Sequence, residues 1–123
     1  MIRGETLTVV VENVPAAEGK IMIEVLAGKT QFDGRTEADV SFRQRANAGS
    51  MTFSTSNLPA GEYAVRIMHD RNGNGELDSN FAGMPTETWA FSNNAAGNFG
   101  PPKWPDVKFD LHGSIVQSIK LSL

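Results

Sequence analysis

The sequence predicts an all-β fold, a single β-sandwich of about seven strands. Three observations predict it. Apolar and polar residues alternate with period two along most of the chain, turns rich in glycine and proline separate the alternating runs, and no segment has a convincing helical period. The chain has 123 residues, so we expect residues 1–123 to form one domain around one core.

The N-terminal strands are predicted from two alternating runs, residues 7–11 and 21–25, each with apolar side chains on one face. Segment 28–38 is polar and contains two glycines, which predicts a loop. A short strand is expected around Val40 and Phe42, although residues 36–46 could instead form a poor helix.

The clearest strand covers residues 62–69, because Tyr63, Val65, Ile67 and His69 fall on one face. An alternating run at 51–55 precedes it, and a proline and glycine turn separates the two. The runs 107–111 and 115–123 predict the last strands. His69 ends the inward face, where a histidine is either a hydrogen-bonded core residue or a residue that binds a ligand or acts as a base.

The strand pattern stops between residues 81 and 105, and this segment is rich in aromatic residues and proline. It predicts a long irregular connection, for which two interpretations remain open. The segment could form a satellite core that covers one end of the sandwich, or it could form a binding surface for a carbohydrate or a peptide. In the second case stacking rings and amide groups would bind the ligand, and the candidates are Trp89, Asn93, Asn94 and Trp104.

A calcium loop is predicted directly after the clearest strand. Asp70, Asn72 and Asn74 occupy alternate positions and a glycine follows, as at positions one, three, five and six of an EF-hand loop. Alternate residues of a tight turn can direct their oxygens inward, and glycine permits the bend. The carbonyl of Glu76 and the carboxylate of Asp78 then match positions seven and nine.

The twelfth position of this loop is Phe81 instead of a bidentate glutamate, and no helical sequence precedes Asp70, so the segment is not an EF-hand. Glu87 is the nearest candidate for the missing carboxylate. The predicted cofactor is Ca²⁺ within segment 70–87, because oxygen ligands without a thiolate favour it. A plain hairpin turn remains the alternative, since both Asn-Gly pairs form type I′ turns without metal. The predicted ligands are Asp70, Asn72, Asn74, Glu76, Asp78 and Glu87.

Composition excludes several classes of protein. The chain has no cysteine, which removes disulfide scaffolds, thiolate zinc sites and cysteine nucleophiles. The formal net charge is −3 without a basic cluster, so no nucleic-acid partner is expected, and no apolar run is long enough for a membrane span. Ser92 lacks the G-x-S-x-G elbow of serine hydrolases. We expect that the protein is not an enzyme and has no catalytic residues.

Residues 58–65 read L-P-A-G-E-Y-A-V, which resembles the L-P-x-G-x-Y-x-V hallmark of prealbumin-like seven-stranded sandwiches, among them carboxypeptidase regulatory domains. A longer pattern runs H-D-x-N-x-N-G-x-L-D from His69, then G-x-P-x-E, F-S-N-N and F-G-P-P. It resembles an uncharacterised family of bacterial exported proteins, a domain of unknown function. The resemblance covers residues 7–121 and implies the sandwich, a periplasmic or secreted location, and an association of Glu87 with the Asp70 loop.

Exported proteins carry a signal peptide, and residues 1–4 are too short and polar to be one, so export would require a leader that has been removed. The expected function is that of a non-enzymatic, calcium-stabilised exported domain. The alternative is a carbohydrate- or peptide-binding module that uses residues 81–105. The partner is unknown, and a cell-envelope polysaccharide or protein is the class that the location implies.

Overall fold

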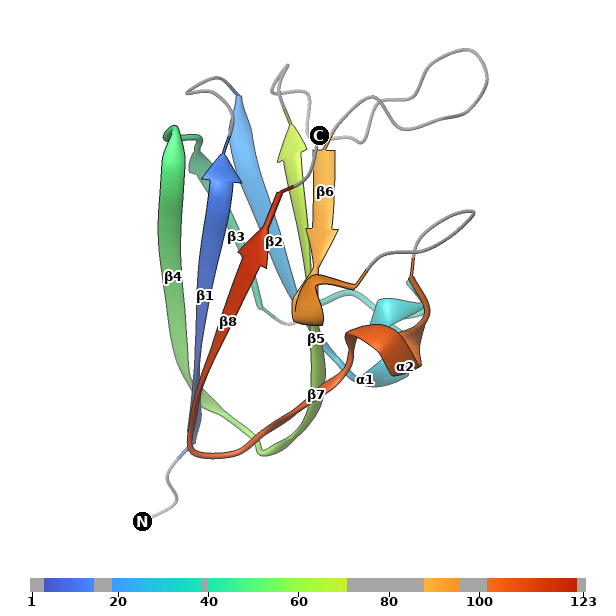
Figure 1. The fold of residues 1–123 in the computed structure, drawn as a ribbon. Coiled ribbons are helices and arrows are strands. Elements are labelled where there is room, and N and C mark those ends of the chain that lie inside the picture. Colours follow the sequence, from blue (N-terminus) through green and yellow to red (C-terminus); the bar gives the residue numbers. More distant parts are fainter. Residues whose placement is uncertain (1–3, 15–18, 39, 71–87, 96–101, 122–123) are drawn as a thin grey trace, which may run out of the picture.

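The computed structural model describes residues 4–14, 19–38, 40–70, 88–95 and 102–121, with Asp70, Thr88 and Trp89 described through their backbone. These residues form two packed β-sheets with short helices at one side (Figure 1). The predicted all-β sandwich is therefore confirmed. None of the helices in the described ranges is long and apolar enough to span a membrane.

The first sheet has three strands in the order β4-β1-β8. Its centre is β1 (Glu5–Val14), which pairs antiparallel with β4 (Gly49–Leu58) and parallel with β8 (Ser114–Lys120). Opposite ends of the chain therefore meet in this sheet, as Figure 1 shows for the blue and red strands.

The second sheet has five strands, all paired antiparallel. Its main order is β3-β2-β5-β6, formed by β3 (Val40–Arg45), β2 (Lys20–Ala27), β5 (Gly61–Asp70) and β6 (Thr88–Phe91). The short strand β7 (Phe109–Leu111) pairs with the first residues of β5. The strand around Val40 is confirmed, so the alternative helix over residues 36–46 is wrong.

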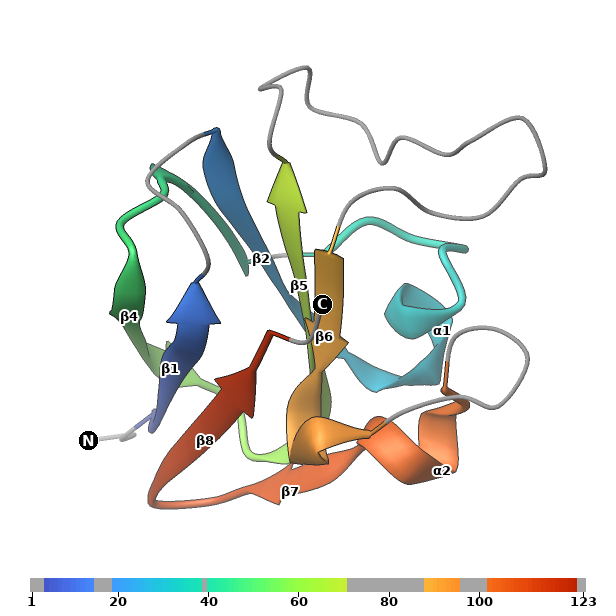
Figure 2. The same ribbon diagram turned by 45° about the horizontal axis from the view of Figure 1, so that its top comes forward.

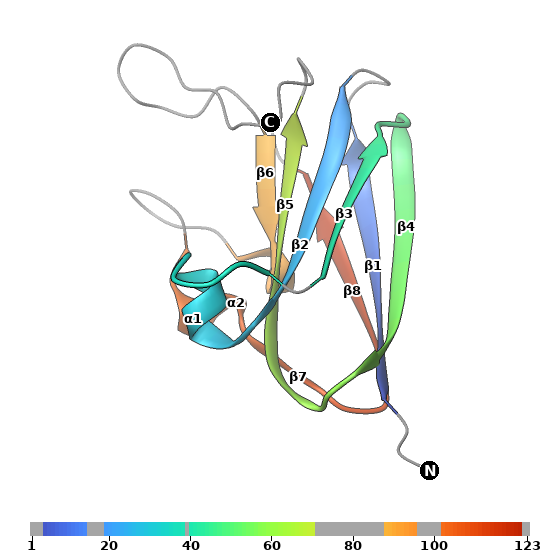
Figure 3. The same ribbon diagram turned by 180° about the vertical axis from the view of Figure 1, so that it is seen from behind.

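Two segments differ from their prediction. Segment 28–38 contains helix α1 (Gly28–Phe32), so its prediction as a loop is wrong for the first half. Within 81–105, the structure describes strand β6, the 3₁₀-helix η1 (Ser92–Asn94) and helix α2 (Trp104–Val107), so this connection is more regular than predicted. Helices α1 and α2 lie side by side next to the β5–β6 edge (Figures 2 and 3).

The main core lies between the two sheets and follows the predicted alternation. In β5 the odd-numbered side chains face inward, from Tyr63 to His69, and are buried. In β2 the inward face comprises Ile21, Ile23 and Val25. Ile119 of β8 is fully buried, whereas Val116, which points the other way, is 62% exposed. Burial of such side chains is the largest favourable contribution to folding.

A second apolar cluster lies on the outer face of the five-stranded sheet. Leu26 and Ala64 point away from the main core and are nevertheless buried, because Phe91 and Val107 pack against them. Half-buried side chains of α1 and α2 complete the cover, including Phe32 and Trp104. The predicted satellite core therefore exists, but it covers a sheet face instead of one end of the sandwich.

The turn between β4 and β5 is fixed by Tyr63. Its ring is buried, and its hydroxyl donates a hydrogen bond of 2.6 Å to the carbonyl of Pro59, four residues upstream. Pro59 restricts the backbone of the turn, and Gly61 adopts a φ of 155° that other residues disfavour. The L-P-x-G-x-Y sequence thus specifies how the chain passes from one sheet to the other.

Candidate functional site

A pocket of about 460 Å³ opens between α1, β5, β6 and the start of α2, and we call it the aromatic hollow. Its volume lies within the range of small-molecule sites in proteins. The apolar side chains that line it are Phe32, Phe91, Pro102, Trp104 and Pro105. The charged side chains that line it are Lys29, Asp33, Arg66 and Lys103.

Three aromatic rings line the hollow. Phe32 contacts Trp104 with ring centroids 5.8 Å apart and planes inclined by 50°, and it meets Phe91 edge-on at 6.4 Å and 67°. Phe91 is buried and fixed in the sheet, whereas Phe32 and Trp104 are half-buried. The rings meet at angles instead of stacking flat, which is a favourable geometry for aromatic pairs and leaves part of each outer ring exposed.

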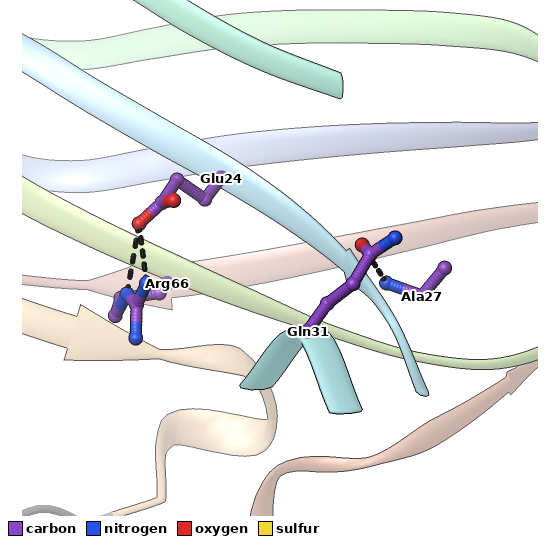
Figure 4. A network of polar contacts seen from close by, with 4 residues as sticks. All are labelled: Glu24, Ala27, Gln31 and Arg66. Carbon is purple, nitrogen blue, oxygen red and sulfur yellow. Dashed lines mark hydrogen bonds and ion pairs between the residues drawn. The ribbon is translucent and has the colours of Figure 1, made fainter. Parts of the chain in front are cut away.

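Local sequence places Phe32 and Trp104 in the hollow. Gly28 begins α1 with a φ of 85°, and Gly34 follows the helix with a φ of 78°, as is typical of a glycine after a helix C-terminus. The side-chain carbonyl of Gln31 accepts a hydrogen bond of 2.7 Å from the amide of Ala27, which fixes the first turn (Figure 4). In α2, Pro105 occupies the first turn, where its missing amide hydrogen costs nothing.

The charged rim is positive in sum. Arg66 directs Nε and Nη2 at one oxygen of Glu24, at 2.9 and 2.6 Å, across the β2–β5 register (Figure 4). Lys29 pairs with Asp33 one helical turn further on. Lys103 forms no ion pair with any residue that the structure describes. Three bases and one acid therefore line the hollow, and one base remains in excess when Glu24 is included.

A buried serine supports the hollow from inside. The hydroxyl of Ser92 is 0% exposed, accepts a hydrogen bond of 3.0 Å from the amide of Val65, and donates one of 2.6 Å to the carbonyl of Val107. It therefore joins β5 to α2 directly behind Phe91. Both hydrogen bonds are buried, so the loss of either would leave a buried backbone group unpaired. The serine therefore stabilises the packing of α2 against β5.

Asn93 and Asn94 lie on the opposite side of this junction and do not line the hollow. The side-chain amide of Asn93 donates to the carbonyls of Asp106 and Lys108, at 3.2 and 2.9 Å, and its oxygen accepts from Gln117. The side chain of Asn94 bonds to the β8 backbone at its carbonyl of residue 118 and amide of residue 120. Both predicted ligand-binding amides thus join η1 to neighbouring parts of the chain.

His69 lies on the inward face near the end of β5 and is 0% exposed. It pairs through its backbone with Ile21 of β2 and Thr88 of β6. Its ring is therefore part of the main core, and it does not line the aromatic hollow. Trp89 lies in β6, where its backbone pairs with Met68.

Only the first predicted calcium ligand lies among the described residues. Asp70 is the last residue of β5, whereas Asn72, Asn74, Glu76, Asp78 and Glu87 lie outside the described residues. Within the described ranges no group of three or more histidine, aspartate or glutamate side chains is placed to hold a metal. The strands that bound segment 71–87 are neighbours, and His69 is paired with Thr88.

Sequence reasoning identified Trp104 but missed the other residues of the hollow. Phe32, Lys29 and Asp33 belong to the segment predicted as a loop, and Arg66 was one of several polar residues on the outer face of a strand. The sequence feature that could have indicated them is the presence of two apolar residues, Leu26 and Ala64, on the outer faces of their strands. Apolar residues on an otherwise polar strand face indicate that something covers it.

Comparisons with known proteins give one family. The family model described as "Uncharacterized protein conserved in bacteria (DUF2141)" matches residues 9–119, which span every described strand at least in part. The chain matches no curated protein and no solved structure. The family match therefore carries no activity with it, and the function has to be argued from the residues.

Proposed function

Since the chain belongs to the uncharacterised bacterial family DUF2141, we propose that it is a non-enzymatic, calcium-stabilised β-sandwich domain exported to the periplasm or beyond the cell. The observation that carries the proposal is the register of β5 and β6. Asp70 ends one strand, Thr88 begins its antiparallel neighbour, and the pairing of His69 with Thr88 brings both ends of the intervening segment to one sheet edge.

This register suits a calcium site, because the predicted ligand set has a carboxylate at each end of the segment. Asp70 is the first position of the predicted loop, and Glu87 immediately precedes Thr88 in the sequence. Three carboxylates at one strand edge would repel one another, and a divalent cation between them removes that cost. Calcium accepts six to eight oxygen ligands in flexible geometry, which suits a loop of mixed carboxylates and amides.

A structural role for the ion agrees with the position of the main core. Among the described residues, core side chains of β1, β2, β5 and β8 belong to one buried apolar cluster between the two sheets. The ion would then close a polar connection at the rim of a sandwich whose described strands share one apolar core. The prealbumin-like assignment is part of the proposal and is supported by the Tyr63 hydroxyl bond to Pro59.

The proposal includes no catalysis. His69 is the candidate base nearest the predicted loop, and its complete burial in the main core is unfavourable for a group that must reach a substrate. Export fits the proposal because extracellular modules use weak calcium sites, with dissociation constants of about 10⁻⁴–10⁻³ M. The predicted loop, which lacks the bidentate glutamate of an EF-hand, needs no higher affinity there.

Thermal unfolding with calcium and with chelator tests the proposal. At calcium one hundred times above the dissociation constant, binding adds about 2.7 kcal/mol, which raises Tm by about 10 °C. Asp70→Ala should abolish this rise and Glu87→Ala should reduce it. Glu37→Ala removes an exposed carboxylate elsewhere and should leave the rise unchanged. Equal Tm values of the unsubstituted chain in calcium and in chelator would show that the proposal is wrong.

A carbohydrate- or peptide-binding module is the second candidate. The observation that favours it is the aromatic hollow, in which the half-buried Trp104 ring remains accessible beside Phe32. Stacking on such a ring is a common mode of ligand recognition. A glycan and peptide array should then give signals that Trp104→Leu removes, and arrays without any signal would count against this role.

A further inference from the structure

The aromatic hollow combines a ring-lined floor with an excess of positive charge, and this combination points to one ligand chemistry. We propose that the hollow binds a small organic anion with a flat apolar body, such as an aryl carboxylate. The inference goes beyond the second candidate function, because an aryl carboxylate is neither a carbohydrate nor a peptide, and it does not depend on the calcium site.

The floor suits a flat apolar body. Trp104 and Phe32 contact each other with their planes inclined by 50°, and Phe32 meets the buried Phe91 edge-on, so three adjoining rings form the floor. A flat ring that lies against this floor contacts aromatic side chains by their faces or edges, the arrangements that aromatic pairs prefer. The buried Pro102 and the exposed Pro105 add rigid apolar surface to the lining.

The charges suit an anion. Lys103 precedes Trp104, is exposed, and forms no ion pair with a described residue, so it can turn toward a carboxylate above the ring. Arg66 is only 27% exposed and is held in place by Glu24, which makes it a fixed positive group at the sheet side of the hollow. Guanidinium and ammonium groups both bind carboxylates through charge-assisted hydrogen bonds.

A neutral sugar fits less well. Among the described residues that line the hollow, no side chain carries a hydroxyl or a neutral amide group. The side-chain amides of Asn93 and Asn94, which the sequence predicted as ligand-binding groups, are bonded to the chain itself. The charged side chains can bond to some hydroxyl groups of a sugar, but a neutral ligand gains nothing from the excess of positive charge. An aryl anion needs only one anchored group.

Titration of the full-length ¹⁵N-labelled chain with two matched probes tests the inference. Naphthalene-2-acetate carries the charge, and naphthalene-2-acetamide has the same ring without it. The acid should shift the Trp104 indole and Lys103 amide resonances and bind about tenfold more tightly than the amide, a difference that added salt reduces. Equal affinities of the acid and the amide would overturn the inference.

Variants assign the two parts of the site. Lys103→Gln should weaken binding of the acid several-fold and leave binding of the amide unchanged, because the substitution removes only charge. Trp104→Leu should weaken both probes. Lys120→Gln removes an exposed positive charge on β8, away from the hollow, and should change neither. If Trp104→Leu does not fold, Lys103→Glu still tests the charge, since that residue is exposed.

Maltotriose serves as the third probe and separates the two proposals. If maltotriose shifts the Trp104 resonances and the naphthalene acid does not, the ligand-binding function stands and the anion inference is wrong. If none of the three probes shifts them, the anion inference is wrong, the glycan and peptide array decides the ligand-binding function, and the calcium proposal is unaffected. An acid that binds equally well to the unsubstituted chain and to Lys103→Gln and Lys103→Glu would also overturn the inference.

Discussion

Ser92 contributes to the fold through two buried hydrogen bonds at once. Its hydroxyl accepts from the amide of Val65 in β5 and donates to the carbonyl of Val107 in α2. Both backbone groups belong to buried residues, so each needs a partner within the protein. A single side chain thereby provides hydrogen-bond partners for backbone groups of two elements that are distant in sequence.

We therefore expect Ser92→Ala to lower the free energy of unfolding by about 1–3 kcal/mol, because it leaves a buried donor and a buried acceptor unpaired. Urea unfolding followed by circular dichroism measures the change. Ser41→Ala, at an exposed position of β3, is the matched control and should stay within about 0.5 kcal/mol of the unsubstituted chain. Equal stabilities of the two variants would contradict the role of Ser92.

The sequence does not reveal this role of Ser92. The F-S-N-N motif was visible, and the absence of a nucleophile elbow excluded one chemistry. The partners Val65 and Val107 become neighbours of Ser92 only when β6 pairs with β5 and α2 folds back. Long-range hydrogen bonds of this kind depend on topology, which local spacing does not specify.

At the scale of elements, η1 is held in place by asparagine side chains. Asn93 has a φ of 63°, in the left-handed region that asparagine tolerates better than most residues. Its amide group reaches two carbonyls at the end of α2, and its oxygen accepts from Gln117 in β8. The short helix therefore connects the two sheets at the edge formed by β6 and β8.

Two substitutions separate the side-chain bonds from the backbone conformation. Asn93→Gly removes the bonds but keeps an easy left-handed backbone, so we expect a loss of about 1–2 kcal/mol. Asn93→Ala should lower the free energy of unfolding by about 1 kcal/mol more, since alanine is strained in the left-handed backbone region. Asn47→Ala, at an exposed asparagine without positive φ, is the control. An alanine variant as stable as the glycine variant, measured by urea unfolding, would contradict this account.

Helix α1 shows why short elements are difficult to predict. Its two glycines predicted a loop, yet Gly28 begins the helix and Gly34 follows its end, positions where helices accept glycine. Five residues give no measurable helical period. What stabilises α1 is packing of Phe32 on Phe91 and Trp104, a tertiary contact.

At the scale of the whole molecule, the sandwich itself was predictable, but the pairing of its strands was not. Alternation identified which side chains face inward, since burial on one face requires period two. Alternation does not say which strands are neighbours, so the parallel pairing of β1 with β8 was not predicted. The calcium ligands were predicted from the sequence, and they remain predictions.

The parallel pairing of β1 with β8 has a consequence for folding. Thr6 pairs with Ser114, near opposite ends of the chain, so closing this contact in an otherwise unfolded chain costs more entropy than closing the β2–β5 pairing. The effective loop between β1 and β8 becomes shorter once β7 has paired with β5, because β8 follows β7 after only a brief turn. We therefore expect β8 to join the sandwich after the five-stranded sheet has begun to form.

The same conservative substitution at two positions tests this order. Ile67 in β5 and Ile119 in β8 are both fully buried, and Ile→Val at either should cost about 0.5–1.5 kcal/mol. Stopped-flow folding and unfolding should show that Ile67→Val mainly slows folding, whereas Ile119→Val mainly speeds unfolding, with a φ-value below about 0.3. A higher φ-value at Ile119 than at Ile67 would mean that the two ends of the chain meet early, because the contacts of β8 would then already exist in the transition state.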